Sequence, residues 1–346
     1  MFDTARGGGE FACLCRLVLA AGGSSSTALQ IAELDPTVPS RVKSILKSAV
    51  AAGSLGDAAW AGRLVELQIA TSGFVDSLKN VGVFDRMLDS MRRVPLRTPL
   101  AVATVAAAGA DVDEVKPAPV SRLTLAGPTL PEMKAQAILV LTREILRAAS
   151  SAATALVGRE LRTSTAAATD RKFLADLADG VTPITSSGSS AAAVLADLAD
   201  MLAAVPTGSA SKLFLVVDSP TAKGLSVKPT TDGTIAFGNM TFSGGEIAGL
   251  PALVSDSLPA SGGSPTLPTA MLIDASQIAA ETDVMTLDVA EHADLQLATN
   301  PVEGAANMVS MWQTNCTALR VSRRFGFERL KSSAVAVLDQ CDWQRN

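Results

Sequence analysis

The chain has 346 residues and a net charge of −5, a length that accommodates about two or three domains of ordinary size. It is 48% hydrophobic but only 4% aromatic, with no tyrosine, and its mean hydropathy of +0.30 is high for a soluble monomer. The longest apolar runs, 135–141 and 100–110, are too short for the ~18–20 residues of a membrane span. Because an obligate interface resembles a domain core cut in half, a large oligomer accounts for the apolar excess better than a membrane does.

The charge balance and the few cysteines exclude further classes. A protein that grips nucleic acid needs a clustered basic surface, which a pI near 5.1 does not favour. The single histidine, His292, is far in sequence from the Cys13–Cys15 pair, so zinc-ligand spacing is missing. Cys316 and Cys341 complete a set of four, too sparse for a disulfide-rich secreted scaffold. We therefore expect reduced thiols, no metal and no cofactor.

The first third of the chain predicts an arm, helices and a hairpin. Residues 1–40 are rich in Gly, Ser and Thr and end in prolines, which indicates an extended arm that packs poorly on itself. Helical spacing of apolar residues follows over 40–91. Two β-prone stretches, 94–105 and 120–125, flank the polar segment 109–119, so we expect a long β-hairpin. Its apolar flanks would be an aggregation hazard unless a neighbouring subunit covered them.

The middle of the chain predicts a strand, two helices and a run of further strands. The strand is expected at 134–141, and a long helix from 151 to about 177. A second helix is expected at 191–204, with one apolar stripe of Val194, Leu195, Leu198, Met201 and Leu202 and with Asp197 and Asp200 opposite. The strands that follow are expected at LFLVV (213–217), TIAF (234–237), ALVS (252–255), AMLID (270–274) and VMTLDVA (284–290).

The C-terminal part predicts one long strand and one short strand. In 317–330, Leu319, Val321 and Phe325 interleave with polar residues, as in a half-buried strand, and 334–338 is a short apolar strand. The long strand carries a basic cluster, Arg320, Arg323, Arg324 and Arg329. We interpret this cluster as a solvated strand face or, alternatively, as a contact to DNA or to acidic residues of a neighbouring subunit.

This C-terminal order of elements resembles that of tailed-phage major capsid proteins with the Hong Kong 97-type fold. Four further segments resemble the family in the same order, so that the resemblance covers roughly 40–343: MKAQAILVLTREIL (133–146), TDRKFL (169–174), KLFLVVDSPTAKGL (212–225) and GGEIAGLPALVSDSLP (244–259). The long charged scaffolding segment that many members carry has no counterpart in this sequence. We expect scaffolding to be a separate protein, to have been trimmed away, or not to be used.

The resemblance implies an α+β fold with a defined division of the chain. The parts it implies are an N-terminal arm (1–45), a helical segment (46–91), an extended hairpin called the E-loop (92–127), a peripheral P-domain with a long spine helix (128–180 and 283–346) and an axial A-domain (181–282). It further implies a virion protein, assembled in the bacterial cytoplasm, whose hexamers and pentamers close an icosahedral shell around double-stranded DNA. Its partners would be other copies of itself, with scaffolding, portal and decoration proteins, and DNA enclosed without sequence-specific binding.

The tip of the hairpin is the first candidate for a contact between subunits. It carries Asp111, Asp113, Glu114 and Lys116, which we expect to face opposite charges on a neighbour. The three acids could also hold a divalent cation through hard oxygen ligands, but the rest of a calcium loop is missing. Lys116 could serve the covalent cross-link that some family members form, although a salt bridge is the simpler expectation.

Two alternatives remain open at this point. An encapsulin-type nanocompartment shares the same fold and would enclose protein cargo in place of DNA. A soluble hydrolase would have to use His292, which stands beside Glu291 and Asp294. The sequence has no G-x-S-x-G elbow and no P-loop, so we expect no catalytic residue, and we expect His292 to face water or a neighbour.

Overall fold

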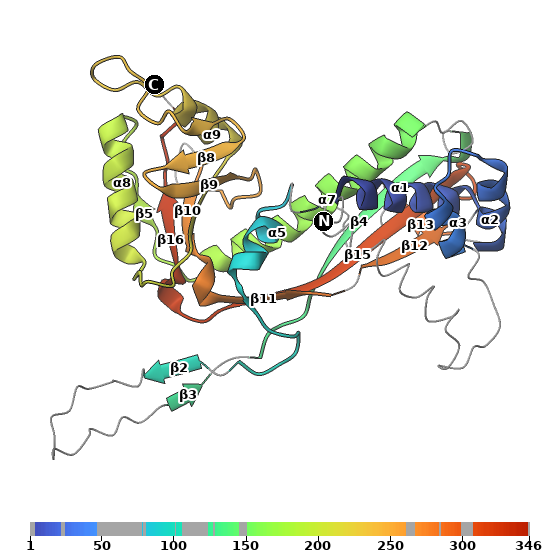
Figure 1. Ribbon diagram of the computed structural model, residues 1–346, viewed down its shortest axis with the longest axis horizontal. Helices are drawn as coiled ribbons and strands as arrows, with labels where there is room; N and C mark the ends of the chain where they lie inside the picture. Colours follow the sequence, from blue (N-terminus) through green and yellow to red (C-terminus); the bar gives the residue numbers. More distant parts are fainter. Residues whose placement is uncertain are drawn as a thin grey trace. The chain divides into compact units, whose positions relative to one another are not determined.

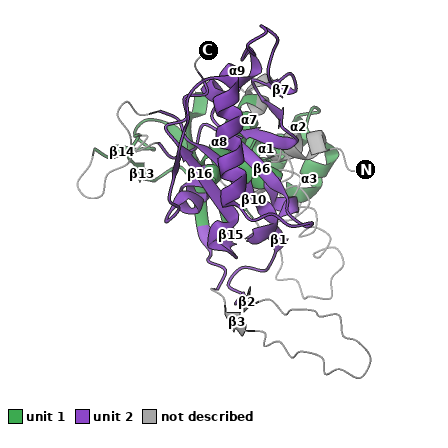
Figure 2. Cartoon of the chain, turned by 90° about the vertical axis from the view of Figure 1, so that its left-hand side faces the viewer, with its two compact units in different colours: residues 1–86, 134–170, 283–324 green, residues 87–133, 171–282, 325–346 purple. Residues whose placement is uncertain are grey.

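The computed structural model describes residues 4–21, 25–46, 78, 81–100, 102–105, 124–126, 129–144, 151–260, 267–283, 285–298 and 307–344. These residues form a mixture of helices and β-sheets, as expected (Figure 1). The chain divides into two compact units, shown in Figure 2: unit 1 comprises 1–86, 134–170 and 283–324, and unit 2 comprises 87–133, 171–282 and 325–346. No helix in the described ranges is long and apolar enough to cross a bilayer.

The N-terminal residues of unit 1 are helical, so the expected extended arm is wrong. They form α1 (Thr4–Ala20), α2 (Ser25–Leu34) and α3 (Ser40–Leu46). Glycine costs a helix only about 1 kcal/mol per residue relative to alanine, and burial of an apolar face offsets that loss. The buried residues these helices share are Leu14, Leu17, Ala28, Ala32, Val38, Val42, Ile45 and Leu46.

A carboxylate fixes the link between α2 and α3. Asp35 accepts hydrogen bonds from the backbone amide of Thr37 at 2.9 Å and from its hydroxyl at 2.6 Å. Arg16 of α1 donates to the same carboxylate at 2.9 Å. These bonds lower the pKa of Asp35 to about 2, the contacts with Thr37 contributing most. These contacts hold the turn after α2 and satisfy the charge of the Asp35 carboxylate.

The rest of unit 1 is built on part of one long strand. The first part of β15 (Cys316–Arg329) pairs antiparallel with β12 (Thr286–Ala290), with Leu287 opposite Val321, and it also pairs with β4 (Met133–Thr142). The predicted strand at 134–141 and the predicted long strand at the C-terminus are thereby confirmed. The first turns of α7 (Ser151–Ala178) pack on this layer, and a small ladder joins β13 (Asp294–Leu295) to β14 (Val309–Ser310).

Unit 2 contains a seven-stranded sheet. In spatial order its strands are β5 (Ile184–Thr185), β16 (Val335–Asp339), β10 (Ala270–Asp274), β6 (Leu213–Val217), β9 (Leu250–Val254), β8 (Gly244–Ile247) and β7 (Met240–Thr241). Apolar side chains of α8 (Ala191–Ala204) and α9 (Ser219–Ser226) share one core with the sheet. The predicted helix at 191–204 and most of the predicted strands are confirmed.

Two expectations within unit 2 fail. The segment 234–237 is no strand, because the Thr230 amide donates to the Thr234 carbonyl at 2.7 Å and closes a tight turn, so that Ile235 makes only an isolated bridge with Pro229. Asp197 does not face outward from α8, since it is fully buried and lies on the same side as Val194 and Met201. Helical spacing of three and four residues puts all three on one face. Leu195 and Leu202, expected on the same stripe, are 49% and 36% exposed instead.

The remaining elements of unit 2 lead to the hairpin. β1 (Arg92–Arg93) pairs parallel with β11 (Ile278–Thr282), which pairs antiparallel with the second part of β15. The hairpin strands β2 (Val102–Val105) and β3 (Thr124–Ala126) pair antiparallel, so the predicted hairpin is confirmed where the structure describes it. Short helical turns connect these elements: η1 (Leu88–Ser90), η2 (Ala275–Gln277) and η3 (Ser332–Ala334). The short helix α5 (Val83–Met87), which precedes η1, belongs to unit 1 up to residue 86.

Candidate functional site

The expected basic cluster on β15 does not form one surface. Arg320 and Arg324 are exposed and Arg329 is half-buried, but Arg323 is fully buried. Side chains alternate along a strand, so residue 323 shares its face with Leu319, Val321 and Phe325. Arg323 therefore cannot contribute to a solvated face or to a contact with DNA or a neighbour, and that expectation is wrong for this residue.

Two other arginines of the cluster are engaged within their own unit. Arg320 donates to Asp288 on β12 at 2.8 and 3.1 Å, directly across the ladder. Arg329 donates to the carbonyl oxygens of Leu177 at 3.3 Å and Asp179 at 2.8 Å. Because the last carbonyls of a helix have no partner inside the helix, Arg329 satisfies the end of α7.

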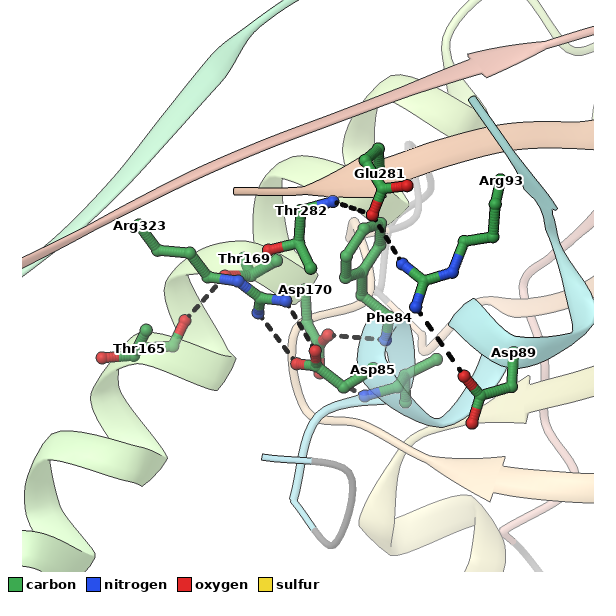
Figure 3. A network of polar contacts seen from close by, with 11 residues as sticks. Phe84, Asp85, Asp89, Arg93, Thr165, Thr169, Asp170, Glu281, Thr282 and Arg323 are labelled. Carbon is green, nitrogen blue, oxygen red and sulfur yellow. Dashed lines mark hydrogen bonds and ion pairs between the residues drawn. The ribbon is translucent and has the colours of Figure 1, made fainter. Parts of the chain in front are cut away.

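Arg323 forms a buried ion pair in unit 1, shown in Figure 3. Its two terminal nitrogens donate to the two oxygens of Asp85, at 2.6 and 2.9 Å, in the forked geometry that suits a guanidinium and a carboxylate. The side chains are 0% and 1% exposed. The guanidinium carbon also lies 5.4 Å from the centre of the Phe84 ring, a cation–π contact.

A second carboxylate completes this buried cluster, which comprises Asp85, Asp170 and Arg323. Asp170, on α7, accepts hydrogen bonds from the backbone amides of Val83 at 2.8 Å and Phe84 at 2.9 Å, as Figure 3 shows. These are the first amides of α5, which have no partner within the helix itself. The buried cluster thus ties together three segments that lie far apart in the sequence: α5, α7 and β15.

The surroundings of the cluster shape its electrostatics. Two carboxylates face one guanidinium, so the cluster carries a net negative charge when all three groups are ionised. Burial raises the pKa of Asp170 to about 6, against the opposing effect of the two amides; the charge of Asp85 also raises it and that of Arg323 lowers it. Gly82 leaves room for the Asp85 carboxylate, because a Cβ at position 82 would lie 3.0 Å from an Asp85 oxygen. All three side chains are buried and hydrogen-bonded, so the cluster has a structural role.

The hairpin tip, with Asp111, Asp113, Glu114 and Lys116, lies outside the described residues, and its contacts stay a prediction. The base of the hairpin is described and belongs to unit 2. Leu130 and Thr98 are joined by a backbone hydrogen bond of 3.0 Å, and Leu100 and Leu130 are buried against Ala279 of β11. The hairpin therefore leaves a packed base, which fixes where its strands start.

His292 and the thiols offer no reactive arrangement. His292 is exposed, and its neighbour Glu291 accepts a hydrogen bond from Arg143 at 2.5 Å, so that carboxylate is engaged elsewhere. The four cysteines are unpaired with one another; burial raises the pKa of Cys15 and raises that of Cys341 to about 12, which keeps both thiols protonated. Within the described ranges, no group of three or more metal-ligating side chains occurs.

Comparison with known proteins decides the family. Residues 62–340 match the phage capsid family. The chain belongs to that family. A capsid polyprotein of Pseudomonas phage PAJU2 is 30% identical over 334 residues, covering 89% of this chain and 49% of the relative. This capsid-family chain therefore spans about half the length of the curated relative it matches.

One solved structure is similar in fold over most of the chain. A chain from Gordonia phage Cozz superposes with a TM-score of 0.52 over 84% of this chain and 98% of that one, at 14% identity. A chain from the capsid of an empty GTA particle gives a TM-score of 0.48 over 73% of this chain and 88% of that one, at 12% identity. Family membership confirms the expected structural, non-enzymatic role and the expected location in the virion capsid, and it goes against the hydrolase hypothesis.

The sequence reasoning missed the buried cluster. Asp85 and Asp170 carry no motif, and their partners come from β15 and α5, far away along the chain. One signal was available: in the alternation of 317–330, position 323 has the parity of the apolar residues. A buried arginine requires a buried acid, so that parity alone would have prompted a search for carboxylates on neighbouring elements.

Proposed function

We propose that this protein is the major shell subunit of a tailed-phage head with the Hong Kong 97-type arrangement. Its copies would join into hexamers and pentamers and close an icosahedral shell around double-stranded DNA, assembled in the bacterial cytoplasm. The observation that carries the proposal is the match to the phage capsid family over 62–340, which includes parts of both units. Scaffolding, portal and decoration proteins would be the further partners of such a subunit.

Within this proposal the parts of the chain take distinct roles. Six strands of the seven-stranded sheet, with α8 and α9, would belong to the axial A-domain (181–282), and α7 with β4 and β15 would belong to the P-domain (128–180 and 283–346). The P-domain range would supply the seventh strand of that sheet, β16. The hairpin (92–127) serves as the E-loop that lies over a neighbour. A two-stranded hairpin is marginal in water by itself, which supports a role in which a second subunit covers it.

The first test is assembly of the purified chain. We expect rings or closed particles in negative-stain electron microscopy and a light-scattering mass far above that of one 35.5 kDa chain. The apolar excess of the chain gives the physical reason, since it fits surfaces that are buried between subunits. A stable monomer under all assembly conditions would contradict the proposal. Protein cargo inside the particles, in place of DNA, would favour the nanocompartment alternative.

A second test concerns the hairpin tip. Deletion of 110–117 should leave a folded subunit that no longer closes shells, because the tip charges are proposed to meet a neighbour. Each exposed pair contributes only about 0–1 kcal/mol, but the same contact would recur in every subunit. Circular dichroism reports the fold and electron microscopy the particles. Normal particles from the deletion variant would show that the tip is not an intersubunit clasp.

A further inference from the structure

Helix α8 of unit 2 is apolar on both of its faces. Its inner face, with Val194, Leu198 and Met201, is buried in the core of the unit. Its outer face is also apolar: Leu195 is 49% exposed and Leu202 is 36% exposed. The exposed residues of this outer face, which we call the α8 face, are Ala192, Leu195, Ala196, Ala199, Asp200, Leu202 and Ala203. A helix that is hydrophobic all round is normally a buried helix, so the α8 face needs a cover.

A second exposed apolar surface lies at the other end of the same sheet. In the strand order, β16, which contacts α8, is next to one edge of the sheet, and β7, which contacts α9, is the opposite edge. Phe242, directly after β7, is 74% exposed, and Val227, directly after α9, is 54% exposed. Ile235, which is 59% exposed, forms a bridge with Pro229, two residues beyond Val227. Together with the exposed Lys223 of α9, these residues make up what we call the α9–β7 end.

We propose that the α8 face of one copy of this chain packs against the α9–β7 end of the next copy, in a head-to-tail contact. The inference rests on the proposed shell function and deepens it, because it names the two surfaces that join neighbouring subunits. Two different surfaces on one unit form a heterologous interface, which closes into a ring when the rotation per copy divides a full turn. A ring is the unit from which a shell of this kind is built.

The chemistry of the two surfaces favours a second copy as the occupant. The small alanines of the α8 face let another backbone approach closely, and the large side chains of the α9–β7 end supply what alanines cannot fill. The only charge on the α8 face is Asp200, and Lys223 is the exposed base on α9. Asp232 and Glu246, in the segments beside Ile235 and Phe242, are also exposed and would repel Asp200. Asp200 therefore meets an opposite charge only at Lys223. The charges thereby limit the contact to one register.

Both surfaces are held rigidly by the core of unit 2. Asp197, on the inner face of α8, accepts hydrogen bonds from the indole of Trp343 at 2.8 Å and from Ser186 and Ser187 at 2.7 Å each. At the other end, Gly224 of α9 lies so close to the chain at Gln344 that a Cβ would be 2.6 Å from its Cα. Preformed surfaces lose little conformational entropy on association, which favours a specific contact.

The test uses two variants, Leu195→Glu on the α8 face and Phe242→Glu on the α9–β7 end. Each side chain is exposed in the subunit, so each variant should keep the fold, which circular dichroism and thermal melting check. The wild-type chain should form particles, and each variant alone should lose them. In a 1:1 mixture, one α8 face and one α9–β7 end remain intact on different chains. Native mass spectrometry should therefore detect a heterodimer that neither variant forms alone.

The possible outcomes separate the inference from the proposed function. If the wild-type chain makes no particles, both fail. If the wild type and both variants make normal particles, the contact is wrong and the shell function stands. If Phe242→Glu assembles while Leu195→Glu does not, α8 pairs with another α8 and the head-to-tail contact is overturned. As a second measurement that introduces no charge into an apolar patch, Asp200→Lys should impair assembly, and adding Lys223→Asp should restore it; no restoration would contradict the register.

Discussion

The two units each bury a carboxylate, and they satisfy it in different ways. In unit 1, Asp85 is held by the charged guanidinium of Arg323, with Asp170 close enough to influence the same charges. In unit 2, Asp197 accepts hydrogen bonds from neutral donors: a serine hydroxyl, a backbone amide and an indole. Both carboxylates tie together segments that are distant in the sequence. They differ in what remains when one partner is removed.

That difference has a physical consequence. Removing one member of a buried ion pair strands a full charge in a medium of low polarity, whereas removing an acceptor from neutral donors strands only dipoles. Unit 1 should therefore respond more severely to a single substitution. Unit 1 should also respond to pH, because the pKa of Asp170 is raised into the range near neutrality.

The largest effect should come from Arg323→Met. The variant leaves Asp85 buried without its counter-charge, and we expect a loss of about 3–5 kcal/mol in the free energy of unfolding. Urea denaturation followed by circular dichroism measures it. The matched control is the double variant Arg323→Met with Asp85→Leu, which removes both charges and should recover much of the loss. A loss below about 1 kcal/mol in the single variant would mean that the pair is not buried as described.

A smaller effect is expected from Asp197→Asn in unit 2. The amide keeps one acceptor oxygen, so part of the network with Trp343 and Ser186 survives and one donor loses its partner. We expect a loss of about 1–3 kcal/mol, the cost of one unsatisfied buried polar group. Asp85→Asn is the matched comparison in unit 1, and it should cost more because Arg323 keeps its charge. Equal losses in the two variants would contradict the distinction between charged and neutral networks.

Arg323 and Asp197 show where prediction from the sequence succeeds and where it fails. The helix at 191–204 could be predicted from the helical spacing of its apolar residues, and the strands at 134–141, 213–217 and 270–274 from short apolar, β-prone runs. Residue type alone predicts exposed faces for Arg323 and Asp197. Their positions in the repeat put them on the buried faces, and the structure follows position. Polar residues at buried positions are the ones whose partners come from elsewhere in the fold.

The N-terminal helices show a second limit. Gly7, Gly8 and Gly9, together with the later serines, are local signals for irregular structure, and they predict an arm. The observed helices depend on contacts among α1, α2 and α3, which bury Leu17, Ala28 and Val42 together. Such contacts are not visible in a local window of sequence, since each helix supplies only part of the core. The buried cluster could not be predicted for the same reason, because its three residues come from three elements that are distant in the sequence.

The next effect concerns pH and isolates Asp170. The pKa of its carboxyl is about 6 in the folded chain against an ordinary value of 3.8, so the folded state takes up a proton first as the pH falls. The contribution of this group to the free energy of unfolding therefore increases as the pH falls from about 7 to about 4, by on the order of 1–3 kcal/mol in total. Asp170→Asn should remove that part of the pH dependence. Urea denaturation of both proteins at several pH values measures the difference, and parallel profiles would exclude a raised pKa for Asp170.

The smallest effect compares two arginines on the same strand. Arg320 and Arg323 are three residues apart on β15, so they point to opposite faces, and each pairs with an aspartate. The side chains of Arg320 and Asp288 are about half exposed, at 49% and 50%, so water and salt screen their attraction. We expect Arg320→Met to change the free energy of unfolding by less than about 1 kcal/mol, and the change should shrink further as salt is added. Urea denaturation at low and high ionic strength tests both statements. Because residue type, strand and partner type are the same, the difference from Arg323→Met isolates burial as the cause. A loss at Arg320 as large as that at Arg323 would show that the strand needs both charges regardless of exposure.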